Sequence, residues 1–290
     1  MTIRSIHAVF AAALVLGLVS TTQATYFEHS SDGLLLLGSD TFESQPLGNI
    51  PSGGGALPNV SPGPGSWTSD IAGNATGRVL SGGSPGAAQG SQYVQMEKSG
   101  LTGQGNKMSL ALDFANDINP ADNGVITARW GIYIDSQAGA NDQSVGVGLK
   151  VNTNGSGADL AYAHFYEDGE LRVGGTGTGG APGGKQVFAG AFPVDTWLSV
   201  EMLYSVVSGS ANDSFGVKIW NNTTGLPTFN TSGVTNTGDN GSRPIRSAVF
   251  FAGNFSNSYI DGFVVPEPST VVIFGIGGFM LFGLRRWTGM

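Results

Sequence analysis

The sequence predicts an all-β protein in which two antiparallel sheets pack face to face as a sandwich. Hydrophobic and polar residues alternate over 108–114, 126–134, 145–151 and 198–206, as they do in strands with one buried face. Glycine is abundant, with 47 residues in 290, and Gly, Asn and Asp gather between these stretches as turns require. No segment between residues 25 and 265 has the 3.6-residue period of a helix. Many short strands joined by such turns favour a sandwich.

The elements follow in order along one predicted domain, residues 25–264. An apolar run at 34–37 predicts a buried strand, and the Gly/Pro/Ser-rich stretch 46–90 is interpreted as loop-rich, with Trp67 holding it to the domain. The strongest hairpin signal is Asp168-Gly169, because a residue pair of this type between two alternating runs is typical of a tight turn. Further strands are predicted at 160–167, 170–173, 215–219, 247–251 and 259–265.

Three local patterns occur in order along this domain. Asp40-Thr-Phe42-Glu43 with Pro46-Leu-Gly48 opens it, Asp195-Thr196-Trp197 enters a long strand, and Tyr259-Ile-Asp261-Gly262-Phe263-Val264-Val265 closes it. In these patterns the chain resembles the jelly-roll domains of the concanavalin A-like lectin and glucanase type. The resemblance implies a carbohydrate-binding or adhesive role, often with bound Ca²⁺. It carries over no ligand-binding residue.

The first 24 residues have the composition of a secretory signal peptide. Arg4 and His7 precede an apolar stretch over 8–19, and small residues then lead to Ala24, after which cleavage is expected. An uncleaved anchor is the alternative, but the apolar stretch is short for a membrane span. The chain has no cysteine, so disulfides do not hold the exported domain together.

The last 26 residues form a second distinct segment. Pro266-Glu267-Pro268 interrupts regular structure, an uncharged apolar run covers 271–284, and Arg285-Arg286 follows. As a helix the run would span roughly 21 Å, which is short of the roughly 30 Å hydrocarbon core of a bilayer. A buried core element is the alternative, but such an element would show alternation or a polar face.

This order of motif, apolar helix and basic end resembles the PEP-CTERM sorting signal of Gram-negative bacteria, over residues 265–290. The resemblance implies transient anchoring in the inner membrane, processing by an exosortase near Pro266, Glu267 and Pro268, and release to the cell surface or extracellular matrix. Arg285 and Arg286 would be the cytoplasmic stop, in agreement with the positive-inside rule. The four residues after Arg286 depart from the family pattern.

Charge and motifs narrow the function. With 13 basic and 21 acidic residues the chain has a net charge of −8, which argues against nucleic acid as a partner. Gly82-Gly-Ser84-Pro-Gly86 has the spacing of a nucleophile elbow but lies in a loop, and His164 is interpreted as a face residue of a strand. We therefore expect a non-catalytic, exported adhesive or glycan-binding protein whose partner is an extracellular polysaccharide. The alternative is a secreted glycan-processing enzyme that draws two carboxylates from distant strands.

Two sets of residues are candidates for binding sites. Trp220 and Trp67 could serve as platforms on which a sugar stacks. Asp117, Asn119 and Asp122 lie in one predicted loop and offer the oxygen ligands that Ca²⁺ prefers, although they lack EF-hand spacing. The alternative for the second set is local turn hydrogen bonding, for which Asn and Asp are common.

Overall fold

A computed structural model describes residues 22–23, 25–30, 34–40, 42–43, 45–51, 55–56, 66–88, 90–98, 107–119, 122, 124–136, 143–153, 159–174, 186–206, 214–235, 244–253 and 256–264. The predicted cleavage residue Ala24, the predicted sorting motif Pro266-Glu267-Pro268, the apolar run 271–284 and Arg285-Arg286 lie outside these residues. Among the described residues, no helix combines the length and the apolar character needed to cross a bilayer.

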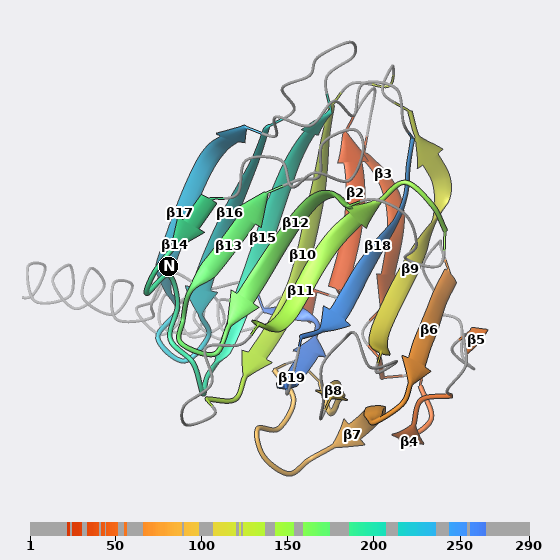
Figure 1. Ribbon diagram of the computed structural model, residues 1–290, viewed down its shortest axis with the longest axis vertical. Coiled ribbons are helices and arrows are strands. Elements are labelled where there is room, and N and C mark those ends of the chain that lie inside the picture. Colours follow the sequence, from red (N-terminus) through yellow and green to blue (C-terminus); the bar gives the residue numbers. More distant parts are fainter. Residues whose placement is uncertain are drawn as a thin grey trace, which may run out of the picture.

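Two antiparallel sheets form the predicted sandwich (Figure 1). The first sheet has the order β17 (Leu226–Thr235), β16 (Ser214–Asn221), β15 (Trp197–Val206), β10 (Gly124–Ile134), β19 (Ser256–Asp261), β8 (Gln92–Lys98), β7 (Ala75–Ser81) and β4 (Gly48–Asn49). A hairpin of β2 (Thr25–Ser30) and β3 (Leu34–Asp40) also joins β10. The second sheet has the order β14 (Gln186–Phe188), β13 (Leu171–Gly174), β12 (Asp159–Tyr166), β11 (Gln143–Lys150), β18 (Ile245–Ala252), β9 (Lys107–Ile118), β6 (Ser66–Ala72) and β5 (Gly55–Ala56). A short ladder joins β1 (Thr22–Gln23) to β20 (Phe263–Val264).

The late strands of the chain lie in the middle of the sheets. In the second sheet β18 lies between β9 and β11, and in the first sheet β19 lies between β8 and β10. Strands that are close in sequence form the flanks, as β11 to β14 and β15 to β17 do. Each sheet is therefore completed by a segment from the last fifth of the chain.

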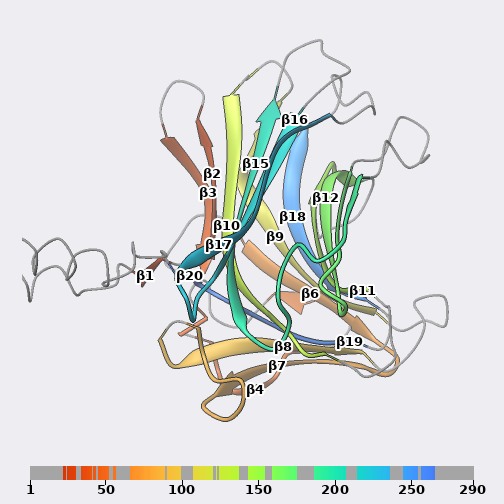
Figure 2. The same cartoon turned by 90° about the vertical axis from the view of Figure 1, so that its left-hand side faces the viewer.

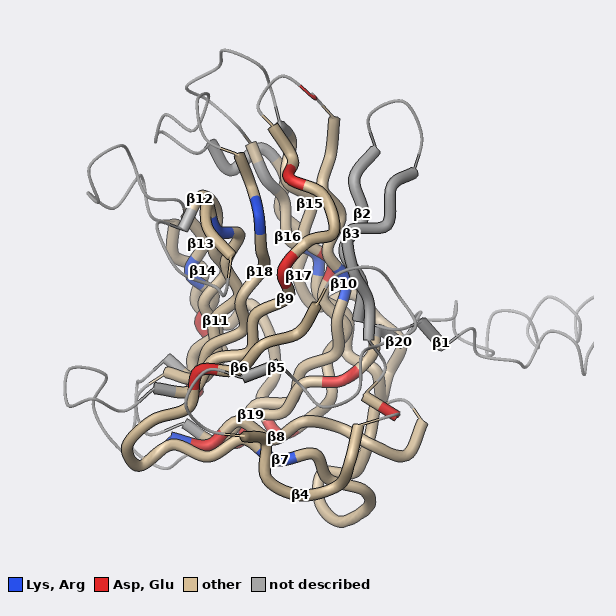
Figure 3. The backbone as a smooth tube through the Cα atoms, turned by 90° about the vertical axis from the view of Figure 1, so that its right-hand side faces the viewer, with Lys and Arg blue, Asp and Glu red and all other residues tan. Residues whose placement is uncertain are grey.

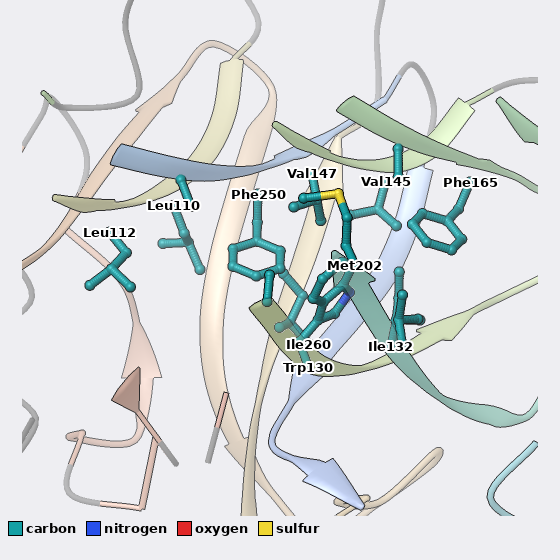
Figure 4. Packing of buried hydrophobic residues seen from close by; sticks show 14 of the residues in the cluster. Leu110, Leu112, Trp130, Ile132, Val145, Val147, Phe165, Met202, Phe250 and Ile260 are labelled. Carbon is teal, nitrogen blue, oxygen red and sulfur yellow. The ribbon is translucent and has the colours of Figure 1, made fainter. Parts of the chain in front are cut away.

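The core between the sheets consists of the alternating residues that the sequence predicts to be buried. Figure 4 shows Trp130, Met202 and Ile260 of the first sheet facing Phe250 and Val147 of the second. Phe250 is 0% exposed, and its ring centroid lies 5.7 Å from that of Trp130 and 6.0 Å from that of Trp67. Phe42 extends this aromatic group, with its ring 5.6 Å from that of Trp67.

Strand β10 changes its neighbour part-way along its length (Figure 2). Residues 125–129 pair with β2, whereas residues 131–134 pair with β19. Gly131 marks the change, and a Cβ atom there would lie 2.5 Å from the backbone oxygen of Gly262. A side chain would therefore push the chain after β19 away from the sheet.

The prediction that 46–90 is loop-rich is wrong for much of the segment, because it contains β4, β5, β6 and β7. Strands β6 and β7 are joined by a turn at Gly73, whose φ is +68°. Their buried positions include Ser69 and Gly77 beside apolar residues, so the hydrophobic alternation is weak in the sequence. The early strand β2 was likewise not predicted.

Replacing Phe250 by alanine tests the aromatic core. The substitution would leave a cavity between Trp67 and Trp130 because the surrounding strands are fixed by their ladders. We expect Phe250→Ala to lower the free energy of unfolding by about 3–5 kcal/mol in denaturant titrations. The control, Leu226→Ala, removes a side chain that is 56% exposed and should cost about 0.5 kcal/mol or less. Equal losses for the two variants would contradict a core centred on Phe250.

Candidate functional site

Seven residues form one continuous row across the outer face of the second sheet. The register pairs each member directly with the next, so the row runs perpendicular to the strands. In order from β6 to β14 the row consists of Asp70, Ser109, Phe251, Gly146, His164, Arg172 and Val187. Six inter-strand steps of about 4.8 Å give this cross-strand row a length of roughly 29 Å.

The middle of the cross-strand row carries an aromatic surface. Phe251 is half-buried and its ring lies over Gly146, where a Cβ atom would overlap the far end of the ring. The ring of His164 stands nearly perpendicular to that of Phe251, with 5.2 Å between the centroids. Tyr162 precedes His164 by two residues on β12 and is buried. The centroids of the two rings lie 4.3 Å apart. Phe251 and His164 are therefore the partly exposed rings of this surface, whereas Tyr162 is buried beside His164.

Arg172 is held in a defined orientation at the next position of the row. Its guanidinium carbon lies 3.8 Å from the centroid of the Tyr166 ring, and its Nη1 donates a 2.8 Å hydrogen bond to the Tyr166 hydroxyl. Its Nε donates to the carboxylate of Glu170. The side chain of Arg172 is 23% exposed, so this ordered guanidinium still reaches solvent.

The charge of Arg172 is secure. Burial acts to lower the pKa of the guanidinium, but the hydrogen bond and charge of Glu170, together with Tyr166, outweigh burial and raise the pKa. The side chain is therefore a permanent cation on this face. Figure 3 shows the charged residues of the described chain as separate short stretches along the tube.

The hairpin between β12 and β13 places Tyr166 and Arg172 on the same face. Gly169 N–H donates to the Tyr166 carbonyl at 3.1 Å, and Tyr166 N–H donates to the Glu170 carbonyl at 2.9 Å. Gly169 has φ +81°, and a Cβ atom there would lie 2.5 Å from the carbonyl oxygen of Phe192. The predicted Asp168-Gly169 turn is thus confirmed, and the Asp168 carboxylate stabilises the turn by accepting a 3.0 Å hydrogen bond from the Glu170 N–H.

A second aromatic group lies on the outer face of the first sheet, where four rings meet edge to face in a closed circuit. The circuit consists of Tyr93, Trp197, Tyr133 and Tyr259, with centroids 5.7–6.3 Å apart. Trp197 Nε1 donates to the Gly86 carbonyl at 2.9 Å and the Tyr93 hydroxyl donates to the Gly82 carbonyl at 2.8 Å. These rings hold the 82–86 loop against the sheet. The elbow-like Gly82–Gly86 spacing therefore belongs to a loop, as the sequence indicates.

Asp135 lies beside this aromatic circuit. It accepts hydrogen bonds from Asn257 and Tyr259 at the end of β10. Burial raises the pKa of Asp135, and the charge of Asp195 raises it further, although the two hydrogen bonds act in the opposite direction. Asp195 in turn accepts from the backbone N–H of Ser136 at 2.8 Å, so the two carboxylates join the ends of β10 and β15.

The structure separates the two tryptophans predicted as glycan platforms. Trp67 is 5% exposed and lies in the core against Phe42 and Phe250, so it does not offer a surface to a sugar. Trp220 is half-buried on β16 and pairs with Ser199 on the outer face of the first sheet. It therefore lies on the opposite side of the sandwich from the cross-strand row.

The candidate calcium ligands have local partners. Asp117 forms a 2.9 Å ion pair with Arg246, and Asp122 accepts a 2.6 Å hydrogen bond from the backbone N–H of Asn119. In the part of the chain that the structure describes, no three His, Cys, Asp or Glu residues are grouped so as to hold a metal ion.

Sequence reasoning missed Arg172 and Phe251 as site residues. His164 was correctly interpreted as a face residue, and its parity with Tyr162 and Tyr166 is visible in the sequence. The sequence signal for Phe251 is its place directly after Phe250: if Phe250 is in the core, the alternation of side chains along a strand turns Phe251 to the outer face. What brings these residues together is the register between β18, β11, β12 and β13, which cannot be deduced from the sequence.

The raised pKa of Asp135 predicts a pH-dependent cost to stability. The folded state holds the proton more tightly than the unfolded chain, where the carboxyl titrates near 3.9. The loss of folding stability caused by ionised Asp135 is therefore absent below about pH 3.9 and develops as the pH rises through the folded-state pKa of this carboxyl. We expect Asp135→Asn to unfold at a higher temperature than the parent at pH 7 and at nearly the same temperature at pH 3.5. A difference in melting temperature that does not change with pH would contradict this account.

Comparisons with known proteins give likeness in fold alone. No family model and no curated protein sequence matches the chain. Similar solved structures include an endo-β-1,4-glucuronan lyase from the fungus Trichoderma reesei, with 10% identity, 65% of this chain and 86% of that chain covered, and a TM-score of 0.44. An alginate lyase from Aplysia kurodai has 10% identity, 64% and 85% coverage and a TM-score of 0.42. Lectin II from Ulex europaeus has 9% identity, 66% and 93% coverage and a TM-score of 0.37. At these scores the likeness assigns neither a ligand nor a reaction to this chain.

Proposed function

We propose that the domain is a glycan-binding protein of the cell surface or extracellular matrix, and that the cross-strand row is its binding surface. The observation that carries the proposal is the combination of an accessible aromatic ring, Phe251, with His164 and Arg172 on one register line. The outer face of an antiparallel sheet does not need aromatic residues for folding, since it can be polar.

The chemistry of this row suits a sugar polymer. A sugar ring has an apolar C–H face that packs on an aromatic ring and hydroxyl groups that need hydrogen-bond partners at its edges. Phe251 supplies the ring, while Ser109 on one side and Arg172 on the other supply polar atoms. A row of roughly 29 Å also suits an extended chain better than a single sugar.

A binding role without catalysis is the simpler of two readings of this surface. The alternative is a secreted glycan-processing enzyme, and it is favoured by one observation: the His164 imidazole lies beside the Tyr162 phenol and is paired with Arg172 in the strand register. An imidazole or a phenol could move a proton at a bound sugar. Release of reducing ends from bound polysaccharide by the full chain would support the enzyme, and binding without release would support the binding protein.

The proposed location follows from the two terminal segments. Residues 1–24 would direct export, and residues 265–290 would hold the protein in the inner membrane until an exosortase acts near Pro266-Glu267-Pro268. Cleavage after Ala24 would remove β1 and leave β2 as the first strand of the domain.

Gly146→Ala tests the cross-strand row. The added methyl group would overlap the far end of the Phe251 ring, so the ring must move while the backbone stays in place. We expect polysaccharide binding by the full chain in detergent micelles, measured by affinity gel electrophoresis, to weaken about tenfold. The comparison variant, Trp220→Ala, lies on the other face and should bind as the parent does. Loss of binding in Trp220→Ala alone would contradict the assignment of the site to this row.

Mass spectrometry of extracellular material tests the proposed sorting. The protein found there should begin after Ala24 and should lack the residues that follow the Pro266-Glu267-Pro268 region. Deletion of residues 265–290 serves as the control, because it should abolish retention in the membrane. Extracellular protein with Met290 intact would contradict processing.

A further inference from the structure

Arg172 has hydrogen-bonding capacity that its neighbours do not use. The Glu170 carboxylate accepts the hydrogen bond from Nε, and the Tyr166 hydroxyl accepts one of the two that Nη1 can donate. Among the residues that the structure describes, Nη2 and the second proton of Nη1 have no partner, although a guanidinium presents five N–H donors. A charged fork with spare donors, fixed in place on the cross-strand row, is poised to receive an acceptor from outside the chain.

We propose that the polysaccharide bound by the cross-strand row carries carboxylate groups, as polymers of uronic acids do, and that Arg172 binds one of these carboxylates. This inference rests on the proposed glycan-binding function and names the chemical class of its ligand. It makes Arg172 the residue that separates acidic from neutral polymers.

The geometry of Arg172 favours a carboxylate over a hydroxyl group. A guanidinium offers two parallel N–H groups that match the two oxygens of a carboxylate, and such charge-assisted bonds are roughly twice as strong as neutral ones. Because the Tyr166 ring and Glu170 already hold the side chain, binding costs little side-chain entropy. A hydroxyl group would use one donor and would leave the charge unmatched.

The surroundings of Arg172 also limit the charge of the ligand. Glu170 offsets part of the positive charge, and the whole chain carries a net charge of −8. A polymer with several anionic groups per sugar would therefore meet stronger repulsion along this surface than a polymer with one, because charges within about 8 Å of each other are incompletely screened at physiological ionic strength. A polymer with one carboxylate per sugar can place that group on Arg172 and the ring of the next sugar on His164 and Phe251, which follow along the row.

The test compares polymers that differ only in charge. The full chain in detergent micelles is titrated with polyglucuronate, polymannuronate and polygalacturonate, and with the methyl ester of each. The ester keeps the backbone of the polymer and removes the negative charge. A sulfated polysaccharide provides a further arm, because it presents anionic oxygens without a carboxylate. We expect at least one free acid to bind about tenfold or more tightly than its ester and than the sulfated polymer.

Variants then assign the preference to one side chain. Arg172→Gln should weaken binding of the free acid about tenfold and leave binding of the ester within about twofold of the parent. The matched control is Arg129→Gln, because Arg129 is also paired with a carboxylate, Glu201 at 2.6 Å, but lies on the outer face of the first sheet. If Arg172→Gln does not fold, Arg172→Lys keeps the charge without the fork and should lose most of the preference for the acid.

The outcomes separate this inference from the function on which it rests. Equal binding of acid and ester by the parent would overturn the inference and leave glycan binding in place. An equal loss of affinity for acid and ester in Arg172→Gln would also overturn it, since Arg172 would then stabilise the surface without binding the carboxylate. Tighter binding of the sulfated polymer would assign the site to sulfate. Binding of no polymer, acidic or neutral, would remove the proposed function as well.

Discussion

The position of Phe250 is the constraint on which both the core and the candidate site depend. Its ring lies between Trp67 and Trp130, which come from opposite sheets, and this contact fixes the register of β18. Because side chains alternate along a strand, Phe251 must then point to the outer face. A slip of one residue would bury Phe251 and expose Phe250, and it would also separate Phe251 from Gly146 and His164. The core thus sets the register that builds the cross-strand row.

The cross-strand row also depends on glycines that place no side chain beside its aromatic rings. Gly146 leaves room for the far end of the Phe251 ring, and Gly174 leaves room for the hydroxyl of Tyr162. Part of the high glycine content therefore serves the outer face of the second sheet, in addition to the turns at Gly73 and Gly169.

The strands with strict alternation, such as 126–134 and 198–206, could be predicted from the sequence because one face of each is continuously apolar. Strand β7 could not, because Gly77 occupies a core position and weakens the hydrophobic period. Trp67 shows the same limit: its indole suited a surface platform as well as a core position, and only the strand pairing decides between them. The cross-strand row draws on strands far apart in the chain, and their order in the sheet is a property of the fold.

The central places of β18 and β19 have a consequence for the nascent chain. Hairpins such as β15–β16 and β12–β13 can form from local contacts soon after their residues are available. Neither sheet can become continuous, however, until residues 245–261 insert between strands made much earlier. During synthesis the chain therefore remains in separate halves with open edges, and closure of the sandwich waits for its final segment. With this topology the domain cannot complete its folding until most of the polypeptide has been synthesised.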